Sequence, residues 1–123
     1  MSDKWVEERA KCTLFKMFKT LENGARRDVE QRNKQVEEPG DQLDFEAEPG
    51  DQHSFMVIRH GPDAAVSFHC ASGVLKVTGP DKLLFRATVT LCDDSKCRWV
   101  IEGQELEDWQ VRKRALEALF GFR

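Results

Sequence analysis

The N-terminal third of the chain carries an apolar stripe at the spacing of an α-helix. The stripe holds its register across Asn23-Gly24 and therefore predicts one long helix over 3–36, with a glycine that costs about 1 kcal/mol. A helix that ends at Asn23 and restarts at Ala25 is the alternative, and Glu38-Pro39-Gly40 predicts the end in both cases. The stripe consists of Val6, Ala10, Leu14, Met17, Phe18, Leu21, Ala25, Val29 and Val36.

A second apolar patch lies on another face of the same predicted helix. It consists of Trp5, Cys12 and Phe15. A helix that packs on one sheet needs a single apolar stripe, so this patch predicts a further interface with a dimer partner, a sheet edge or another helix. A helix that is more buried than average is the alternative explanation.

The middle of the chain alternates apolar and polar residues, as strands with one buried face do. The clearest case is 83–91, which a turn at Asp93-Asp94-Ser95 joins to a second β-rich run, 97–101. Aligning the apolar faces of this hairpin places Leu91 opposite Cys97. Runs at 53–60, 65–70 and 74–78 extend the pattern, and a four-residue loop at 61–64 would place Phe55 opposite Cys70. We therefore predict a meander of about five antiparallel strands over 53–101.

Helical spacing returns at 105–120, where Trp109 and Leu116 share one apolar sector. We expect this helix to dock on the same sheet through these two residues. The predicted fold is α+β, with a long N-terminal helix and a C-terminal helix packed mainly on one face of the sheet. A chain of 123 residues corresponds to a single domain by length.

The segment 37–52 is acidic and rich in turns. It contains a repeated Glu-Pro-Gly-Asp-Gln sequence and seven acidic residues without Lys or Arg, whereas the whole chain has 22 acidic and 19 basic residues. The remainder of the chain is therefore net basic, by 19 minus 15. A solvated loop is the simpler interpretation. A contact with the basic remainder, within one chain or between subunits, is the alternative.

Composition and the N-terminal residues favour a cytoplasmic protein. The first nine residues lack the apolar core of a signal peptide, and no run reaches the roughly 20 apolar residues of a membrane span. Cysteines are mostly reduced in the cytoplasm, so we expect four thiols.

Cys92 and Cys97 flank a four-residue turn and invite a disulfide or half of a zinc site. The aligned hairpin register places Cys92 in the loop, where a bridge is harder to close. Cys12 and Cys70 do not supply the close pairs of a structural zinc site. We therefore expect unbridged thiols and no metal, with the 92–97 bridge as the alternative.

No arrangement of residues predicts catalysis or a bound cofactor. His60 and His69 share a strand face but lie about 13 Å apart at about 3.3 Å per residue, too far for one metal. Adjacent strand residues point to opposite faces, so His69 and Cys70 do not form a catalytic pair. Phosphate-binding loops, nucleophile elbows and zinc-protease motifs are not found in the sequence.

Two groups of polar residues are candidate binding surfaces. The first is the polar sheet face, where a curved sheet would line a pocket with Arg59, His60, His69, Arg86 and Thr88. The second is an anion contact on the last helix at Arg112, Lys113 and Arg114. A pI of about 5.6 argues against a nucleic-acid partner.

The first functional hypothesis is a non-catalytic protein that acts by contact with another protein or with itself. The second is a small-molecule binder or enzyme with a pocket on the curved sheet. The third is a binder of anionic surfaces.

Overall fold

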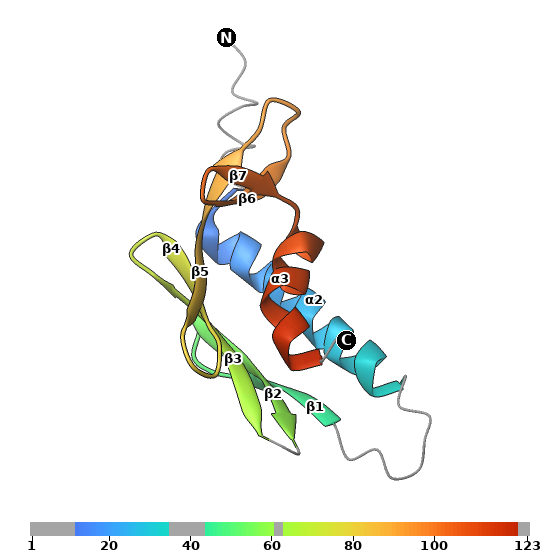
Figure 1. Ribbon diagram of the computed structural model, residues 1–123. Coiled ribbons are helices and arrows are strands. Elements are labelled where there is room, and N and C mark those ends of the chain that lie inside the picture. Colours follow the sequence, from blue (N-terminus) through green and yellow to red (C-terminus); the bar gives the residue numbers. More distant parts are fainter. Residues whose placement is uncertain (1–11, 35–43, 61–62, 121–123) are drawn as a thin grey trace.

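The computed structural model describes residues 12–34, 44–60 and 63–120. Within these ranges a single antiparallel sheet has two helices side by side on one face (Figure 1). The elements are α2 (Leu14–Lys34), β1 (Asp44–Pro49), β2 (Ser54–His60), β3 (Ala64–Ala71), β4 (Val74–Thr78), β5 (Leu83–Leu91), β6 (Cys97–Ile101), β7 (Gln104–Leu106) and α3 (Asp108–Phe120).

The sheet is a meander in which each strand pairs with the next, which confirms an α+β fold with an antiparallel sheet. It has seven strands rather than about five. The additional strands are the two edges: β1 forms within the segment 37–52, so the interpretation of that segment as a solvated loop is wrong at 44–49, and β7 forms at the start of the predicted last helix. The side-chain amide of Asn33 on α2 bonds both the N–H and the carbonyl of Phe45, at 3.0 and 2.8 Å, and so fixes β1 to the helix. At the other edge, Glu102 and Gly103 both have positive φ, as a two-residue hairpin turn into β7 requires.

The predicted register is right for one hairpin and shifted for the other. Leu91 lies opposite Cys97 and Val89 opposite Trp99, as the apolar alignment predicts. In the β2–β3 hairpin Phe55 lies opposite Phe68, not Cys70. This shift is by two residues, and an even shift keeps every side chain on its predicted face.

Helix α2 begins at Leu14, so the prediction of helix from residue 3 is wrong at 12–13; its parts at 3–11 and 35–36 lie outside the described residues. Thr13 is the N-cap, because its hydroxyl accepts a hydrogen bond from the N–H of Lys16 at 3.2 Å. The helix is continuous through Gly24, as predicted. Gly24 allows α3 to approach closely, since a Cβ there would lie 2.7 Å from Nε of Arg112.

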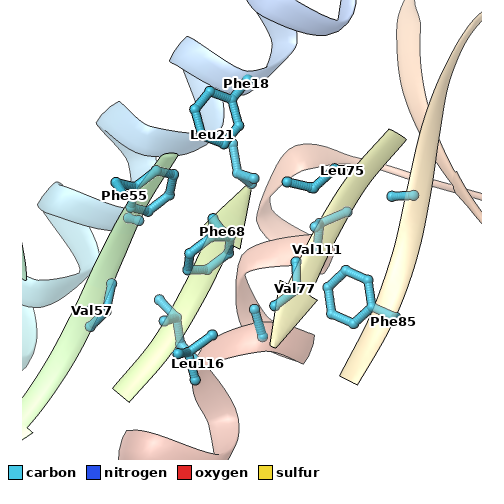
Figure 2. Close-up of a cluster of buried hydrophobic side chains, with 14 of the residues drawn as sticks. Phe18, Leu21, Phe55, Val57, Phe68, Leu75, Val77, Phe85, Val111 and Leu116 are labelled. Carbon is cyan, nitrogen blue, oxygen red and sulfur yellow. The ribbon is translucent and has the colours of Figure 1, made fainter. Parts of the chain in front are cut away.

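The inner face of the sheet is filled by the two helices. Figure 2 shows side chains of α2 and α3 packed over those of the strands. The Phe55 and Phe68 rings stack with centroids 4.4 Å apart, and Phe18 of α2 contacts Phe55 at 5.3 Å. The labelled side chains are Phe18, Leu21, Phe55, Val57, Phe68, Leu75, Val77, Phe85, Val111 and Leu116.

Helix α3 begins at Asp108 rather than at residue 105, because Gln104–Leu106 forms β7. Leu116 docks in the core as predicted, but Trp109 is 53 % exposed. Of the two tryptophans that the structure describes, Trp99 on β6 is the fully buried one. Neither described helix combines the length and the apolarity of a membrane span.

A disulfide joins Cys12, just before α2, to Cys97 on β6, with the two Cα atoms 5.4 Å apart. The expectation of four thiols is therefore wrong for this pair. Cys92 and Cys97 are not bridged to each other, and Cys70 and Cys92 are free. The partners are 85 residues apart, and only the packing of α2 against the sheet brings them together.

Candidate functional site

The five residues predicted to line a pocket on the sheet do not share one surface. His60, His69, Arg86 and Thr88 lie on the outer face, which the helices leave open. Arg59 lies on the inner side, where its guanidinium donates a hydrogen bond to the carbonyl of Leu119 at 3.3 Å. That carbonyl lies in the last turn of α3, so the arginine charge stabilises the negative end of the helix dipole. His60 is 3.2 Å from the Glu46 carboxylate and 3.6 Å from that of Asp63.

The lysine Lys76, the arginine Arg86 and the imidazole of His69 form a row across neighbouring strands of the outer face, here called the cationic row after its lysine and arginine. His69 on β3 lies directly opposite Lys76 on β4, and Lys76 lies opposite Arg86 on β5. All three are exposed. Lys76 is not among the residues predicted for the polar sheet face, although it alternates along β4 with the buried residues Leu75 and Val77.

The predicted interface patch on α2 is only partly described. Trp5 lies outside the described residues, and Cys12 is engaged in the disulfide. Phe15 is 47 % exposed; its ring contacts that of His53 edge-on at 6.4 Å, and Nζ of Lys19 lies 5.4 Å above it.

Phe15 stands at the wall of a groove of about 610 Å³, here called the Phe15 groove. The Asp51 carboxylate at its polar side accepts hydrogen bonds from the His53 N–H at 2.8 Å and the Ser54 hydroxyl at 3.0 Å, which lower the pKa of Asp51. The groove is lined by Leu14, Phe15, Phe18, Asp51, His53, His69, Cys70, Ala71, Ser72 and Gly73.

The thiol that lines the Phe15 groove is a poor nucleophile. Burial raises the pKa of the Cys70 thiol to about 11, so this thiol is protonated near neutral pH and is a poor nucleophile. Among the described residues, no three His, Cys, Asp or Glu side chains lie close enough together to hold a metal ion.

The predicted anion contact on the last helix divides into two parts. Arg112 turns inward, where its guanidinium bonds both carboxylate oxygens of Asp28 at 2.8 Å, the Gly24 carbonyl at 3.1 Å and Asp108 at 3.0 Å. Burial raises the pKa of Asp108 despite its hydrogen bonds from Trp99 and Arg112. Arg112 therefore clamps α3 to α2.

Lys113 and Arg114 remain exposed beside Trp109. The Trp109 indole donates a hydrogen bond from Nε1 to the Glu107 carboxylate at 2.9 Å, which holds the ring in place. The depression around it measures about 270 Å³. We call this region the Trp109 surface; it consists of Gln104, Leu106, Trp109, Gln110, Lys113, Arg114 and Glu117.

No protein family model, no curated protein sequence and no solved structure matches this chain. The candidate surfaces are therefore judged on their geometry and chemistry. Those surfaces are the cationic row on the outer face, the Phe15 groove and the Trp109 surface.

Proposed function

We propose that the protein is a non-catalytic binding module that contacts another protein through the Trp109 surface. The observation that supports this proposal best is the indole of Trp109, which is 53 % exposed and held by Glu107. Tryptophan is among the residues most enriched at the energetic centres of protein interfaces. A ring that is already fixed loses little conformational freedom when a partner binds.

The exposed part of Trp109 is large enough to anchor a complex. A tryptophan side chain presents up to about 250 Å², and 53 % of it is exposed. Burying that part, about 130 Å², contributes about 3 kcal/mol at about 25 cal/mol per Å². This value exceeds the roughly 2 kcal/mol that defines an interface hot spot.

The charges beside the ring indicate the chemistry of the partner. Lys113 and Arg114 are exposed, and neither forms an ion pair with a described carboxylate. A complementary surface therefore combines an apolar pocket for the indole with carboxylates at its rim.

Site-specific photo-cross-linking tests the proposal. A photoreactive amino acid at position 113 reports on the Trp109 surface. The same amino acid at position 82 is the control, since Lys82 is equally an exposed lysine but lies between β4 and β5. In an extract of the source cells we expect the protein labelled at position 113 to form one discrete adduct. The same protein with the additional substitution Trp109→Ala should not form it. Equal adducts from both positions, or an adduct that survives Trp109→Ala, would contradict the proposal.

The Phe15 groove supports a second candidate function, the binding of an apolar small molecule. The residues predicted to line a pocket on the polar sheet face do not share one surface, whereas Leu14, Phe15 and Phe18 give the Phe15 groove of about 610 Å³ an apolar wall. A fluorescent apolar probe should bind the wild type and be lost in Phe15→Asp, while Leu83→Asp retains it. Equal binding to both variants argues against a ligand in the groove.

A further inference from the structure

The Asp51 carboxylate is held in a fixed position at the polar side of the Phe15 groove. It begins the turn that leads into β2, and two main-chain hydrogen bonds close this turn. The Gly50 N–H donates to the Ser54 carbonyl at 3.1 Å, and the Ser54 N–H donates to the Asp51 carbonyl at 3.4 Å. Within the turn, Oδ1 of Asp51 accepts the hydrogen bonds from the His53 N–H and the Ser54 hydroxyl. The direction of the carboxylate is therefore set before any ligand binds.

The same carboxylate carries a negative charge that no described Lys or Arg neutralises. Its hydrogen bonds hold the pKa of Asp51 low, so the group is ionised at neutral pH. Neither Lys nor Arg is among the described residues that line the groove, and Asp51 forms no ion pair with any residue that the structure describes. Its second oxygen, Oδ2, accepts no hydrogen bond from them either. A ligand with a positive charge would supply the missing partner.

Aromatic rings lie beside this carboxylate. His53, two residues after Asp51, contacts the Phe15 ring edge-on with the ring centroids 6.4 Å apart, so the turn and the first turn of α2 are neighbours at the groove. Phe18 forms the deeper part of the wall, since it is only 1 % exposed. A cation is attracted to the face of an aromatic ring within about 6 Å of its centroid. The groove therefore combines an anion with apolar surface that also favours a cation.

The basic side chains around the groove do not compete for Asp51. Nζ of Lys19, which lies above the Phe15 ring, pairs with the Glu22 carboxylate at 3.5 Å. The lysine and the arginine of the cationic row lie on the outer face of the sheet, whereas the buried Cys70 at the bottom of the groove lies on the inner face.

We infer that the Phe15 groove binds a small apolar molecule that carries a protonated amino group. The ammonium group pairs with Oδ2 of Asp51, and the apolar body lies against Phe15 and Phe18. A volume of about 610 Å³ is within the range of about 300–1,000 Å³ that ligand sites have. The two imidazoles that line the groove can accept further hydrogen bonds when they are neutral. This inference rests on the second candidate function and specifies its ligand.

Fluorescence titration tests the inference with three naphthalene derivatives that differ only in their end group, which is an ammonium, a hydroxyl or a sulfonate. Asp51→Asn removes the charge but keeps a side-chain oxygen that accepts the hydrogen bonds of the turn. Asp81→Asn is the control, since Asp81 is an exposed aspartate beyond the other end of β4. Circular dichroism establishes that each variant is folded.

We expect the wild type and Asp81→Asn to bind the ammonium probe about tenfold more tightly than the hydroxyl probe, and the sulfonate probe most weakly. Asp51→Asn should bind the ammonium and hydroxyl probes equally. Raising the salt from about 0.1 M to 1 M shortens the Debye length from about 10 to 3 Å and should reduce the preference of the wild type. This comparison does not depend on the folding of any variant.

The probes test the groove and its ligand class separately. A hydroxyl probe that does not bind the wild type, or that still binds Phe15→Asp, contradicts ligand binding in the groove. Equal binding of the ammonium and hydroxyl probes by the wild type overturns the inference alone. So does tighter binding of the sulfonate probe, or a preference for the ammonium probe that survives Asp51→Asn or high salt.

Discussion

The Cys12–Cys97 disulfide leads to the largest single effect on stability that we expect. It closes a loop with a sequence separation of 85 residues and fixes the start of α2 to β6. Breaking it, by reduction or by Cys12→Ser, returns the entropy of that loop to the unfolded chain. In the predicted cytoplasmic location the bridge would be exposed to reductants. A protein that works there has to remain folded when the bridge is reduced.

The chain-entropy model gives the size of the effect. For a loop of about 85 residues the lost entropy corresponds to about 4.6 kcal/mol at 25 °C. Small domains have unfolding free energies of about 5–15 kcal/mol, so the reduced protein should be folded but marginal. With a urea m-value of about 2 kcal/mol/M, the unfolding midpoint should fall by about 2 M.

Urea unfolding with and without reductant measures this shift, and Cys92→Ser is the matched control because Cys92 is already a free thiol. A thiol titration in denaturant should find two thiols before reduction and four after it, since the chain has four cysteines. Four thiols before reduction, or midpoints that coincide with and without reductant, would refute the reasoning.

Three further predictions follow from packing and titration. Trp99→Ala should lower the unfolding free energy by about 3–5 kcal/mol in a denaturant titration because Trp99 is fully buried, whereas Trp109→Ala should lower it by clearly less because 53 % of Trp109 is exposed; equal effects would contradict the placement of the two rings. Gly24→Ala should destabilise by about 1–3 kcal/mol because the new Cβ meets the Arg112 side chain, and the same change in an Arg112→Ala background should cost less; an undiminished cost there would contradict this cause. The raised pKa of Cys70, about 11, means that the unfolded thiol loses its proton first, so the unfolding free energy should fall as the pH rises from about 9 toward 11, and Cys70→Ala should flatten that part of the profile.

The sequence predicts the elements that follow from local periodicity. Alternation along 83–91 and the apolar match of Val89 with Trp99 establish a strand pair and its register. The apolar stripe through Gly24 identifies a continuous helix. In both cases the hydrophobic pattern extends over enough residues that local sequence alone determines whether the segment forms a strand or a helix.

Features that depend on tertiary contacts are not visible in the sequence. β7 has three residues, and its turn requires a positive φ at Glu102, a residue type that gives no turn signal. Helical spacing assigns Trp109 to the buried sector, but Arg112 takes the place toward α2 because Asp28 neutralises it there. His69 and Arg86 lie on one face with Lys76 between them, and the alternation of Lys76 with the buried Leu75 and Val77 is the signal that points to it.

The most direct test of the proposed binding role is the affinity of the cross-linked partner, once identified and purified, for three forms of the protein. Calorimetry compares the wild type with Trp109→Ala and with Leu83→Ala, which removes an exposed apolar side chain elsewhere. A loss of at least about 2 kcal/mol corresponds to a roughly 30-fold weaker dissociation constant. We predict that loss for Trp109→Ala and an unchanged affinity for Leu83→Ala. Equal affinity of all three forms would contradict a binding role for the Trp109 surface.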